Sequence, residues 1–445
     1  MSGPAADPHV QVRWAHPSEF GQIATLSATI FDPATPPEAS YLTPTVRDIT
    51  SGRHPLARPE DYAVAVDGRT GAVVASAVLF RQPWSLGSEV LVAGRPEIVV
   101  TSADYRGRGI MREVLALLHR RSAELGHPAQ CITGVPYVYR RVGYDYTHPF
   151  GHGYALRASA APSTGSPPGR AGGLTVRRAA APDVDGLTAL LASGREATAA
   201  GTPVDSAYLA FSVDGQDPRS RRGVTALVCE AGDRLHAVAL LARGPGSAPA
   251  RIVAASLDPS ADPLAVFAAL SRRTVEDFRA QADGAADPTD SPTMQLALGD
   301  DHLLYDAARA LGSTLTPFTT DHWYFRIPDA AVFLEALAPE LTRRLQCSAF
   351  RRFRGTIVLS AYTASVRLTI VDGAVSGVSA VDDVRDVAAA TVVRVAPDRL
   401  SALLTGHSSI QELMTSTPET AAAPGTAALA AALFPRLRAQ TMPLD

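Results

Sequence analysis

The sequence predicts a mixed α/β (α+β) protein built from three domains. At 445 residues the chain is too long for one compact core. Residues 159–173 are rich in Pro, Gly and Ser and lack apolar periodicity, as expected of a linker. On both sides of this stretch, short strand-like segments alternate with helical ones, which is typical of layered α/β folds.

The first two domains are expected to share one structural unit. Residues 12–15 and 176–179 each look like a short strand. Each strand precedes a helical stretch with apolar residues at matching offsets, Ile23 and Leu26 in the first copy and Leu187 and Leu190 in the second. The register between the copies needs no gap, so we expect two copies of one α/β unit.

The third domain is expected to begin near residues 327–329, where an aromatic strand gives way to a helical pattern. Strand-like runs follow at 355–359 and 365–370, and helical stretches at 397–405 and 409–414. This order favours an α+β layer. The expected domain ranges are 1–160, 174–328 and 329–445, with the linker at 161–173.

Composition and charge exclude several classes of protein. The net charge of −3 is unlike that of a nucleic-acid binder, and no apolar run approaches the ~18 residues of a membrane helix. The first eight residues lack a signal-peptide pattern. The three cysteines form no CxxC pair and no His pair has metal spacing, so we expect no metal site. A soluble cytoplasmic protein is expected.

The informative stretch is an arginine-rich loop between a strand and a helix. Residues 97–100 form a β-branched strand, 105–112 (YRGRGIMR) form the loop, and a helix follows from Met111 until a stop at Gly126. This arrangement directs free backbone N–H groups and a helix dipole at an anion. A glycine turn needs no ligand, but three arginines in and beside this one favour a phosphate site.

The loop resembles the coenzyme A loop of the GCN5-related N-acetyltransferases (GNAT), written [QR]-x-x-G-x-[GA], through Arg106 and Gly109. Met111 replaces the last small residue, as in the enhanced intracellular survival (Eis) acetyltransferases of actinobacteria, whose loop reads R-x-R-G-[LI]-[LM]-R. The resemblance continues at 118–121 (LHRR) and 138–144 (VYRRVGY). It implies two tandem GNAT-like domains, a sterol-carrier-protein-like C-terminal domain, acetyl-CoA as co-substrate and a homohexamer.

The second GNAT-like unit is expected to lack the cofactor loop. Its corresponding strand, residues 251–255, leads into 258–263 (DPSADP). The two prolines of this loop cannot donate hydrogen bonds, and its two acids would repel phosphate. We therefore expect this unit to be structural.

The resemblance assigns cofactor contacts along the first unit. The pyrophosphate would bind backbone N–H groups of the loop, and a backbone N–H on the strand edge would stabilise charge on the thioester carbonyl, because the family's strand splays from its neighbour. The expected cofactor-binding residues are Val99, Val100, Thr101, Gly107, Arg108, Gly109, Ile110, Met111, Arg112, Gly134 and Val135.

Three further residues are candidates for the chemistry. Tyr139 matches the family's catalytic acid, which protonates the leaving thiolate, although it is also one of four clustered tyrosines that could simply pack a strand. The terminal carboxylate of Asp445 would take a proton from the amine, a role that the family usually gives to the carboxylate of a terminal aromatic residue. Asp32 lies in the region that lines the family's acceptor cleft; it either holds a cationic amine or is a solvated loop acid before Pro33.

The resemblance leaves several acceptors open. An acetyl-CoA-dependent N-acetyltransferase acting on a polyamine-like small molecule, such as an aminoglycoside, is the leading hypothesis, with no nucleic-acid or membrane partner. Protein lysine and an intermediate of antibiotic biosynthesis are alternative acceptors. A non-catalytic lipid or polyketide carrier, using the third domain, is an alternative of another class.

Overall fold

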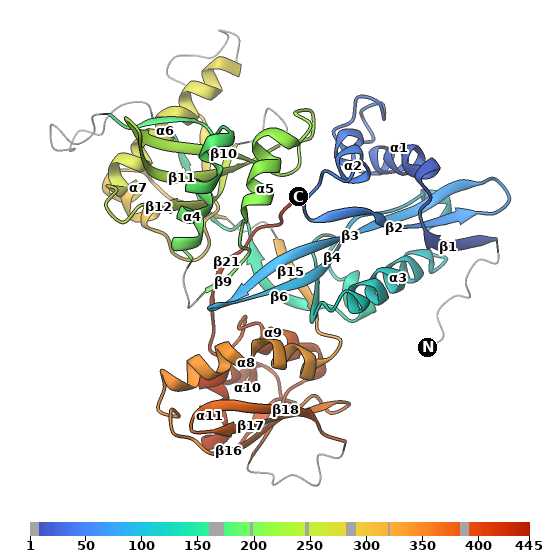
Figure 1. Ribbon diagram of the computed structural model, residues 1–445, viewed down its shortest axis with the longest axis vertical. Helices are drawn as coiled ribbons and strands as arrows, with labels where there is room; N and C mark the ends of the chain where they lie inside the picture. The colour runs from blue at the N-terminus through green and yellow to red at the C-terminus, as the bar shows by residue number, and fades with distance from the viewer. Residues whose placement is uncertain are drawn as a thin grey trace.

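The computed structural model describes residues 9–159, 173–195, 199–244, 249–281, 291–318, 321–382 and 391–445. Within these residues the strands form three sheets, each with its own helices (Figure 1). The mixed α/β class is therefore confirmed. The expected linker at 161–173 lies outside the described residues apart from Gly173.

The first sheet is covered on both faces. Its path is β1-β2-β3-β4-β5-β15-β6, with β9 and β21 attached beside β3. Tyr62 and Val64 pack against the α1 and α2 side, whereas Ala63 and Ala65 pack against α3, because successive strand residues point to opposite faces. The elements are β1 (Val10–Trp14), β2 (Ala57–Asp67), β3 (Ala72–Leu86), β4 (Glu89–Thr101), β5 (Ala129–Ile132), β6 (Asp145–Phe150), β9 (Ala199–Gly201), β15 (Asp321–Arg326), β21 (Arg438–Gln440), α1 (Phe20–Phe31), α2 (Leu42–Thr50) and α3 (Ile110–Glu124).

The second sheet repeats the start of the first. Helix α4 begins at Val184, 164 residues after α1 begins at Phe20, which is the offset predicted from the sequence. The sheet runs β14-β7-β13-β12-β11-β10-β8. Its elements are β7 (Gly153–Arg157), β8 (Thr175–Arg178), β10 (Val224–Ala231), β11 (Arg234–Ala242), β12 (Ala250–Leu257), β13 (Thr293–Leu296), β14 (Thr316–Phe318), α4 (Val184–Ser193), α5 (Ser206–Ala210), α6 (Pro263–Gln281) and α7 (Leu303–Ala310).

The third sheet has five strands in the order β18-β17-β16-β19-β20 and belongs to an α+β unit, as expected. Its elements are β16 (Gly355–Ser360), β17 (Ser365–Val371), β18 (Ala374–Ala380), β19 (Val392–Arg394), β20 (Ala421–Ala422), α8 (Ala330–Gln346), α9 (Leu400–Leu404), α10 (Ile410–Ser416) and α11 (Pro424–Leu433). Across the part of the chain that the structure describes, no helix has the length and apolar character needed to cross a bilayer.

The first two sheets exchange strands across the sequence. β15 follows most of the second unit in the chain, yet it pairs with β5 and β6 in the first sheet. β7 follows directly on β6, yet it pairs with β13 and β14 in the second sheet. The domain ranges drawn from the sequence stay a prediction, and the two sheets are interlocked across them.

The units also share hydrophobic cores. One cluster joins Ile23 and Ile49 of the first unit to Leu187 and Tyr208 of the second. The end of the chain enters this same cluster through Leu444, and Figure 1 shows the C-terminus lying between the two units. A second cluster joins the far part of the first sheet to the third unit. The C-terminal tail is therefore part of the core between the first two units.

We expect Leu444→Ala to destabilise the protein strongly, because Leu444 is fully buried between two units. Truncating a buried leucine costs about 2–5 kcal/mol. Chemical denaturation would measure the change in the free energy of unfolding. Val90→Ala on β4 is the matched control, since Val90 is exposed, and its effect should stay within about 0.5 kcal/mol. Equal effects would mean that the tail is not part of the core.

Candidate active site

The loop between β4 and α3 forms a small hollow at the start of the helix. Its volume is about 190 Å³, and its lining is Thr101, Tyr105, Arg106, Gly107, Gly109, Ile110, Met111 and Arg112. Gly107 and Gly109 have φ of 77° and 80°, a backbone region that favours glycine. Nothing lies within 4 Å of a Cβ built on Gly107, so a ligand could approach the backbone there.

This hollow has the features of an anion site. The first N–H groups of a helix have no acceptor within the helix, and the dipole places positive charge there. The side chains of Arg106 and Arg112 add cationic charge at its wall. Arg108 does not line the hollow, because its guanidinium lies 4.9 Å from the centre of the Tyr105 ring and donates to the main-chain oxygen of Asp104. Most of the loop residues that were expected to bind the cofactor therefore line the hollow.

A bulge interrupts β4 just before Val99. The pairing of β4 with β3 shifts register between Val78↔Glu97 and Ser76↔Val100. At this bulge Ile98 has φ 49°, a conformation that β-branched residues rarely adopt and that costs about 1–3 kcal/mol. Bulges concentrate beside active sites, where they redirect backbone groups.

Beyond the bulge, no strand among the described residues pairs with one edge of β4. The parallel pairing with β5 covers only Ala93↔Ala129 and Gly94↔Gln130, whereas the pairing with β3 continues to Thr101. β5 instead continues along β15. The two strands therefore splay, and Val99, Val100 and Thr101 lie on an open edge whose backbone groups could bind an extended ligand.

Tyr139 stands close to this edge. It begins a short 3₁₀ helix (Tyr139–Val142) and packs in a cluster that includes Val99 of β4 and Met111 of the loop. Its ring centre lies 5.7 Å from that of Tyr324 and 6.2 Å from that of Tyr144, both edge-on. A Cβ built on Gly134, which has φ 125°, would lie 3.7 Å from the Tyr139 hydroxyl oxygen. Gly134 therefore keeps the approach to that hydroxyl clear.

The Tyr139 hydroxyl differs from those of the other tyrosines in this cluster. The hydroxyl of Tyr144 makes a 2.8 Å hydrogen bond with His119, and those of Tyr146 and Tyr324 bond each other at 2.7 Å. The Tyr139 hydroxyl has no hydrogen bond to any described residue. Burial, together with the negative charge of Glu97, raises the pKa of Tyr139 above its ordinary value. At neutral pH this group is a protonated donor without a partner.

The neighbouring loop exposes apolar side chains. The side chains of Val135, Tyr137 and Val138 are at least half-exposed, and they lie in the segment that follows β5. Tyr137 has φ 70° and its amide donates to the hydroxyls of Tyr146 and Tyr324. This loop holds Gly134 and Val135, which the sequence assigned to the cofactor, beside the open end of the splayed strands.

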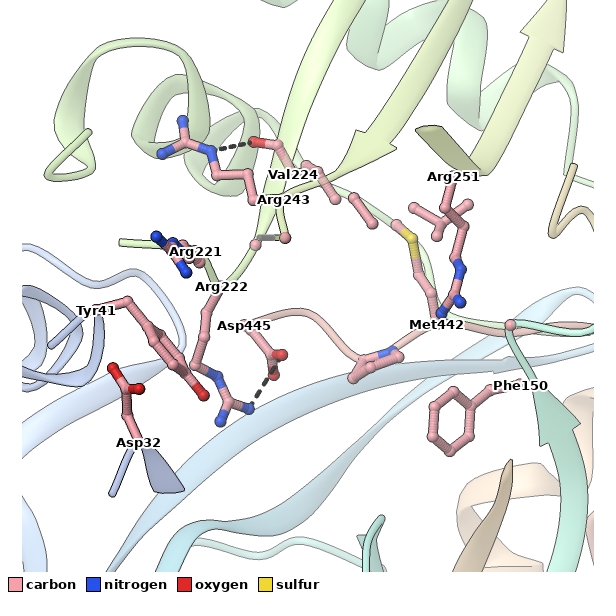
Figure 2. Close-up of a pocket in the computed structure, with 16 residues that line it drawn as sticks. Asp32, Tyr41, Phe150, Arg221, Arg222, Val224, Arg243, Arg251, Met442 and Asp445 are labelled. Atoms are coloured by element: carbon pink, nitrogen blue, oxygen red, sulfur yellow. Dashed lines mark hydrogen bonds and ion pairs between the residues drawn. The ribbon is translucent and has the colours of Figure 1, made fainter. Parts of the chain in front are cut away.

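A second, larger pocket lies where the first unit, the second unit and the C-terminal tail meet. Figure 2 shows Asp32 and Tyr41 at its lower left, Arg251 at its upper right and Asp445 between them. Its volume is about 490 Å³, within the usual range for small-molecule sites. Asp32 and Asp445, both expected from the sequence, therefore line one pocket, separate from the hollow at the loop.

A buried ion cluster forms the floor of this pocket and reaches β4. The Nη2 atom of Arg222 lies 2.7 Å from Oε2 of Glu97 and 3.0 Å from Oδ2 of Asp445. The Nη2 atom of Arg95, which is fully buried, lies 2.8 Å from Oδ1 of Asp445 and donates to the Leu444 carbonyl at 2.7 Å. Since Glu97 directly precedes the bulge, the cluster connects the pocket lined by Asp32 and Asp445 to the open edge of β4.

The Asp445 side chain is an ionised anchor. Burial alone would raise the pKa of this carboxyl, but the charges of Arg222 and Arg95 outweigh it and lower the pKa to about 2. The main-chain oxygen of Asp445 accepts a 3.2 Å hydrogen bond from the hydroxyl of Tyr208. Both ends of this residue are thus held in place.

Sequence reasoning missed the residues that organise the site. Ile98 was read as an ordinary strand residue, and its left-handed backbone follows only from the pairing with β3. Glu97 and Arg95 alternate on β4, and the pair Arg221-Arg222 lies in the second unit, where no cofactor loop was expected. A buried strand that carries two ionisable residues at alternate positions is the signal that could have found Arg95 and Glu97. Across the described residues no three His, Cys, Asp or Glu side chains gather as metal ligands.

The comparisons with known proteins agree with this geometry. Residues 11–147 match the family described as "Acetyltransferase (GNAT) domain", which confirms the resemblance inferred from the loop. No curated protein matches the chain.

Several solved structures share the fold of the whole chain. A GCN5-related N-acetyltransferase from Kribbella flavida is 18% identical, with 98% of this chain and 99% of that chain covered and a TM-score of 0.63. Eis1 from Mycobacterium abscessus is 16% identical, with 96% and 97% covered and a TM-score of 0.56. A probable N-acyltransferase from Enterococcus faecalis V583 is 13% identical, with 97% and 98% covered and a TM-score of 0.63. At this identity the likeness establishes the fold.

We expect Asp445→Asn to lower the free energy of unfolding by about 2–3 kcal/mol at neutral pH, because the carboxyl pKa falls from an ordinary 3.8 to about 2 on folding. A lowered pKa stabilises the folded state above pH 4, and this contribution is lost as the pH falls through 2. Urea unfolding at several pH values should therefore show the variant approaching the wild type between pH 5 and pH 2.

The control for this titration is Asp372→Asn, whose exposed ion pair with Arg354 lies in the third unit. An exposed pair contributes at most about 1 kcal/mol, so this variant should stay close to the wild type throughout. A difference between Asp445→Asn and wild type that did not change with pH would contradict the lowered pKa.

Proposed function

Since residues 11–147 form a GNAT acetyltransferase domain, we propose that the protein transfers an acetyl group from acetyl-CoA directly to the amine of a small molecule, using the hollow at the loop, the open edge of β4 and Tyr139. GNAT domains use acetyl-CoA as the acetyl donor, and the donor set of the loop fits its pyrophosphate. Backbone N–H groups at the start of α3 and the side chains of Arg106 and Arg112 would hold the phosphates.

The observation that carries the proposal is the convergence of three groups on one spot. The open edge of β4 after Ile98 and the start of α3 come together at the cluster that contains Tyr139, because Val99 and Met111 pack against this cluster. An extended pantetheine arm could pair with the strand edge as an additional strand would. Its thioester would then reach the bulge, where a backbone N–H can stabilise charge on the carbonyl oxygen.

Tyr139 supplies the proton that the reaction needs on sulfur. When the amine nitrogen bonds to the thioester carbon, the carbon–sulfur bond breaks and the thiolate leaves with the electron pair. Tyr139 is positioned to donate its hydroxyl proton to that sulfur, which general acid catalysis requires. Its raised pKa keeps the hydroxyl protonated at neutral pH but makes it a weaker acid than an ordinary phenol, so the transfer to sulfur would depend on the position of the hydroxyl.

A carboxylate in the buried ion cluster would accept the proton of the attacking amine, directly or through water. The terminal carboxylate of Asp445 is the group expected from the sequence, whereas the side-chain carboxyl of this residue, with a pKa of about 2, is a weak base. Glu97 is a second candidate that one observation favours, since it directly precedes the bulge and its charge acts on Tyr139. Asp32, which lines the same pocket as Asp445, is proposed to contact the acceptor.

The finer expectations stay proposals. These are a polyamine-like acceptor such as an aminoglycoside, a sterol-carrier-protein-like third domain, a homohexamer and a cytoplasmic location. Release of free thiol from acetyl-CoA across a panel of amines tests the activity itself. Thiol release that depends on an amine supports the proposal, whereas its absence with every amine, in protein that also fails to bind coenzyme A, would falsify it.

We expect Arg106→Glu combined with Arg112→Glu to weaken coenzyme A binding by at least ~10²-fold, because charge-assisted phosphate contacts become repulsive. Calorimetry of coenzyme A binding would measure the change. Arg120→Glu reverses the same charge on the exposed face of α3, outside the hollow, and should bind normally. Unchanged affinity in a folded double variant would mean that the loop does not hold the phosphates.

We expect Tyr139→Phe to lower kcat by about 10²–10⁴-fold with little change in coenzyme A affinity, because loss of a general acid acts on the chemical step. The substitution keeps the ring and its packing. Steady-state kinetics with acetyl-CoA would measure the loss.

Tyr144→Phe removes the same atom from a neighbouring ring, but from a hydroxyl that bonds His119. It should lower stability by roughly 1–3 kcal/mol and leave kcat within a few-fold. Comparable losses of kcat in the two variants would mean that the tyrosines act only by packing.

A further inference from the structure

The pocket that holds Asp32 and Asp445 opens into an adjoining larger one. The larger pocket has a volume of about 1050 Å³, and the two share Asp32, Tyr41, Arg221 and Arg243 in their walls. The walls carry more arginines than acids. Four arginines and two aspartates line the smaller pocket, and six arginines and three acids line the larger one.

Five of these arginines have no carboxylate partner among the described residues, namely Arg157, Arg178, Arg221, Arg243 and Arg251. Arg243 donates to the main-chain oxygens of Val224 and Ser212, at 3.2 and 3.1 Å. Arg251 donates to the side-chain oxygen of Gln295 at 2.6 Å. These contacts orient two guanidinium groups and leave their positive charge uncompensated.

Both cations are partly buried and have no carboxylate within ion-pair distance among the described residues. Burial lowers the pKa of both Arg243 and Arg251 below the ordinary value. Elsewhere in the site buried arginines are matched, as Arg222 is by Glu97 and Asp445. A bound anion would supply the missing charge, and planar guanidinium groups suit carboxylate and phosphate oxygens.

One arginine of the smaller pocket stands apart from the acids. Asp32, Tyr41 and Arg221 lie on one side, Asp445 lies near the centre, and Arg251 lies across the pocket from Asp32 (Figure 2). Apolar side chains, among them Phe150, Val224 and Met442, form the wall between them. An amine at the acidic side and an anion at Arg251 would span the pocket along this apolar wall.

From this arrangement we infer that the acceptor carries an anionic group, a phosphate or a carboxylate, in addition to the amine that is acetylated. The inference rests on the proposed function. It assigns recognition of the anion first to Arg251, across the pocket from Asp32, and then to Arg221, which lines both pockets. A polycation such as an aminoglycoside would bring like charges against these arginines, so the inference keeps the proposed acetyl transfer to an amine but replaces the polyamine-like acceptor named above.

Matched pairs of acceptors test the inference with the full-length enzyme. Lysine is compared with cadaverine, which lacks the carboxylate, and glucosamine 6-phosphate with glucosamine. Thiol release from acetyl-CoA gives kcat/KM for each amine. We expect the anionic member of at least one pair to be preferred by about 10- to 100-fold, the effect of one or two charge-assisted hydrogen bonds. A preference for lysine over cadaverine would indicate a carboxylate, and a preference for glucosamine 6-phosphate over glucosamine would indicate a phosphate.

Arg251→Gln and Arg221→Gln should remove most of that preference by raising KM for the anionic amine while kcat changes little. Arg221 is exposed and contacts no other described residue through a hydrogen bond or ion pair, so its loss should not disturb folding. Arg251→Lys should restore part of the preference. Arg352→Gln removes an exposed arginine of the third unit and serves as the control.

A binding measurement tests this inference independently of the proposed acetyl transfer. Calorimetry with glucosamine 6-phosphate and with lysine, in the presence of saturating coenzyme A, needs no turnover. Binding that Arg251→Gln abolishes supports the anion site even in a protein that transfers no acetyl group. Equal use of the charged and uncharged amines, a preference for an aminoglycoside, or anion binding that both arginine variants retain would overturn the inference.

Discussion

The buried ion cluster of Arg95, Glu97, Arg222 and Asp445 ties all three parts of the chain together. Arg95 and Glu97 stand on β4, Arg222 enters from the second unit, and Asp445 arrives with the tail that follows the third. A fully buried guanidinium without a carboxylate costs about 3–5 kcal/mol. Arg95 acquires its close carboxylate partner only when the tail is in place, so the order of β4 depends on segments 350 residues away.

The proposed chemistry therefore lies where the first sheet, the second unit and the C-terminal tail meet. The bulge at Ile98 belongs to the first sheet, but the ion pairs beside it come from the second unit and the tail. The second unit, which the sequence suggested was only structural, supplies all four arginines that line the proposed acceptor pocket. A repeated unit that is expected to lack the phosphate-binding loop can therefore still form part of the wall of a pocket shared with the other unit.

The sequence predicted what depends on local pattern. The strand, loop and helix around Gly109 and the 164-residue offset between α1 and α4 follow from periodicity and turn residues, and they appear where expected. In the third unit the predicted strands at 355–359 and 365–370 and helices at 397–405 and 409–414 are present, whereas β18, β19, β20 and α11 were not predicted. Long-range pairing was not predictable in this way. That β15 lies between β5 and β6, that β4 and β5 splay after Gly94, and that Arg222 meets Asp445 depend on how distant segments pack. The local propensities of a single sequence do not carry that information.

The place of β15 in the first sheet sets the timing of folding during synthesis. The strand lies between β5 and β6, whose residues end at Phe150, but β15 itself ends at Arg326. At about 5–20 residues per second, the ribosome needs roughly 10–35 s to make the intervening stretch. For that time the nascent first sheet has a gap between β5 and β6, with unpaired backbone on both sides. Chaperones that bind exposed strand edges would act on the nascent chain before β15 has been made.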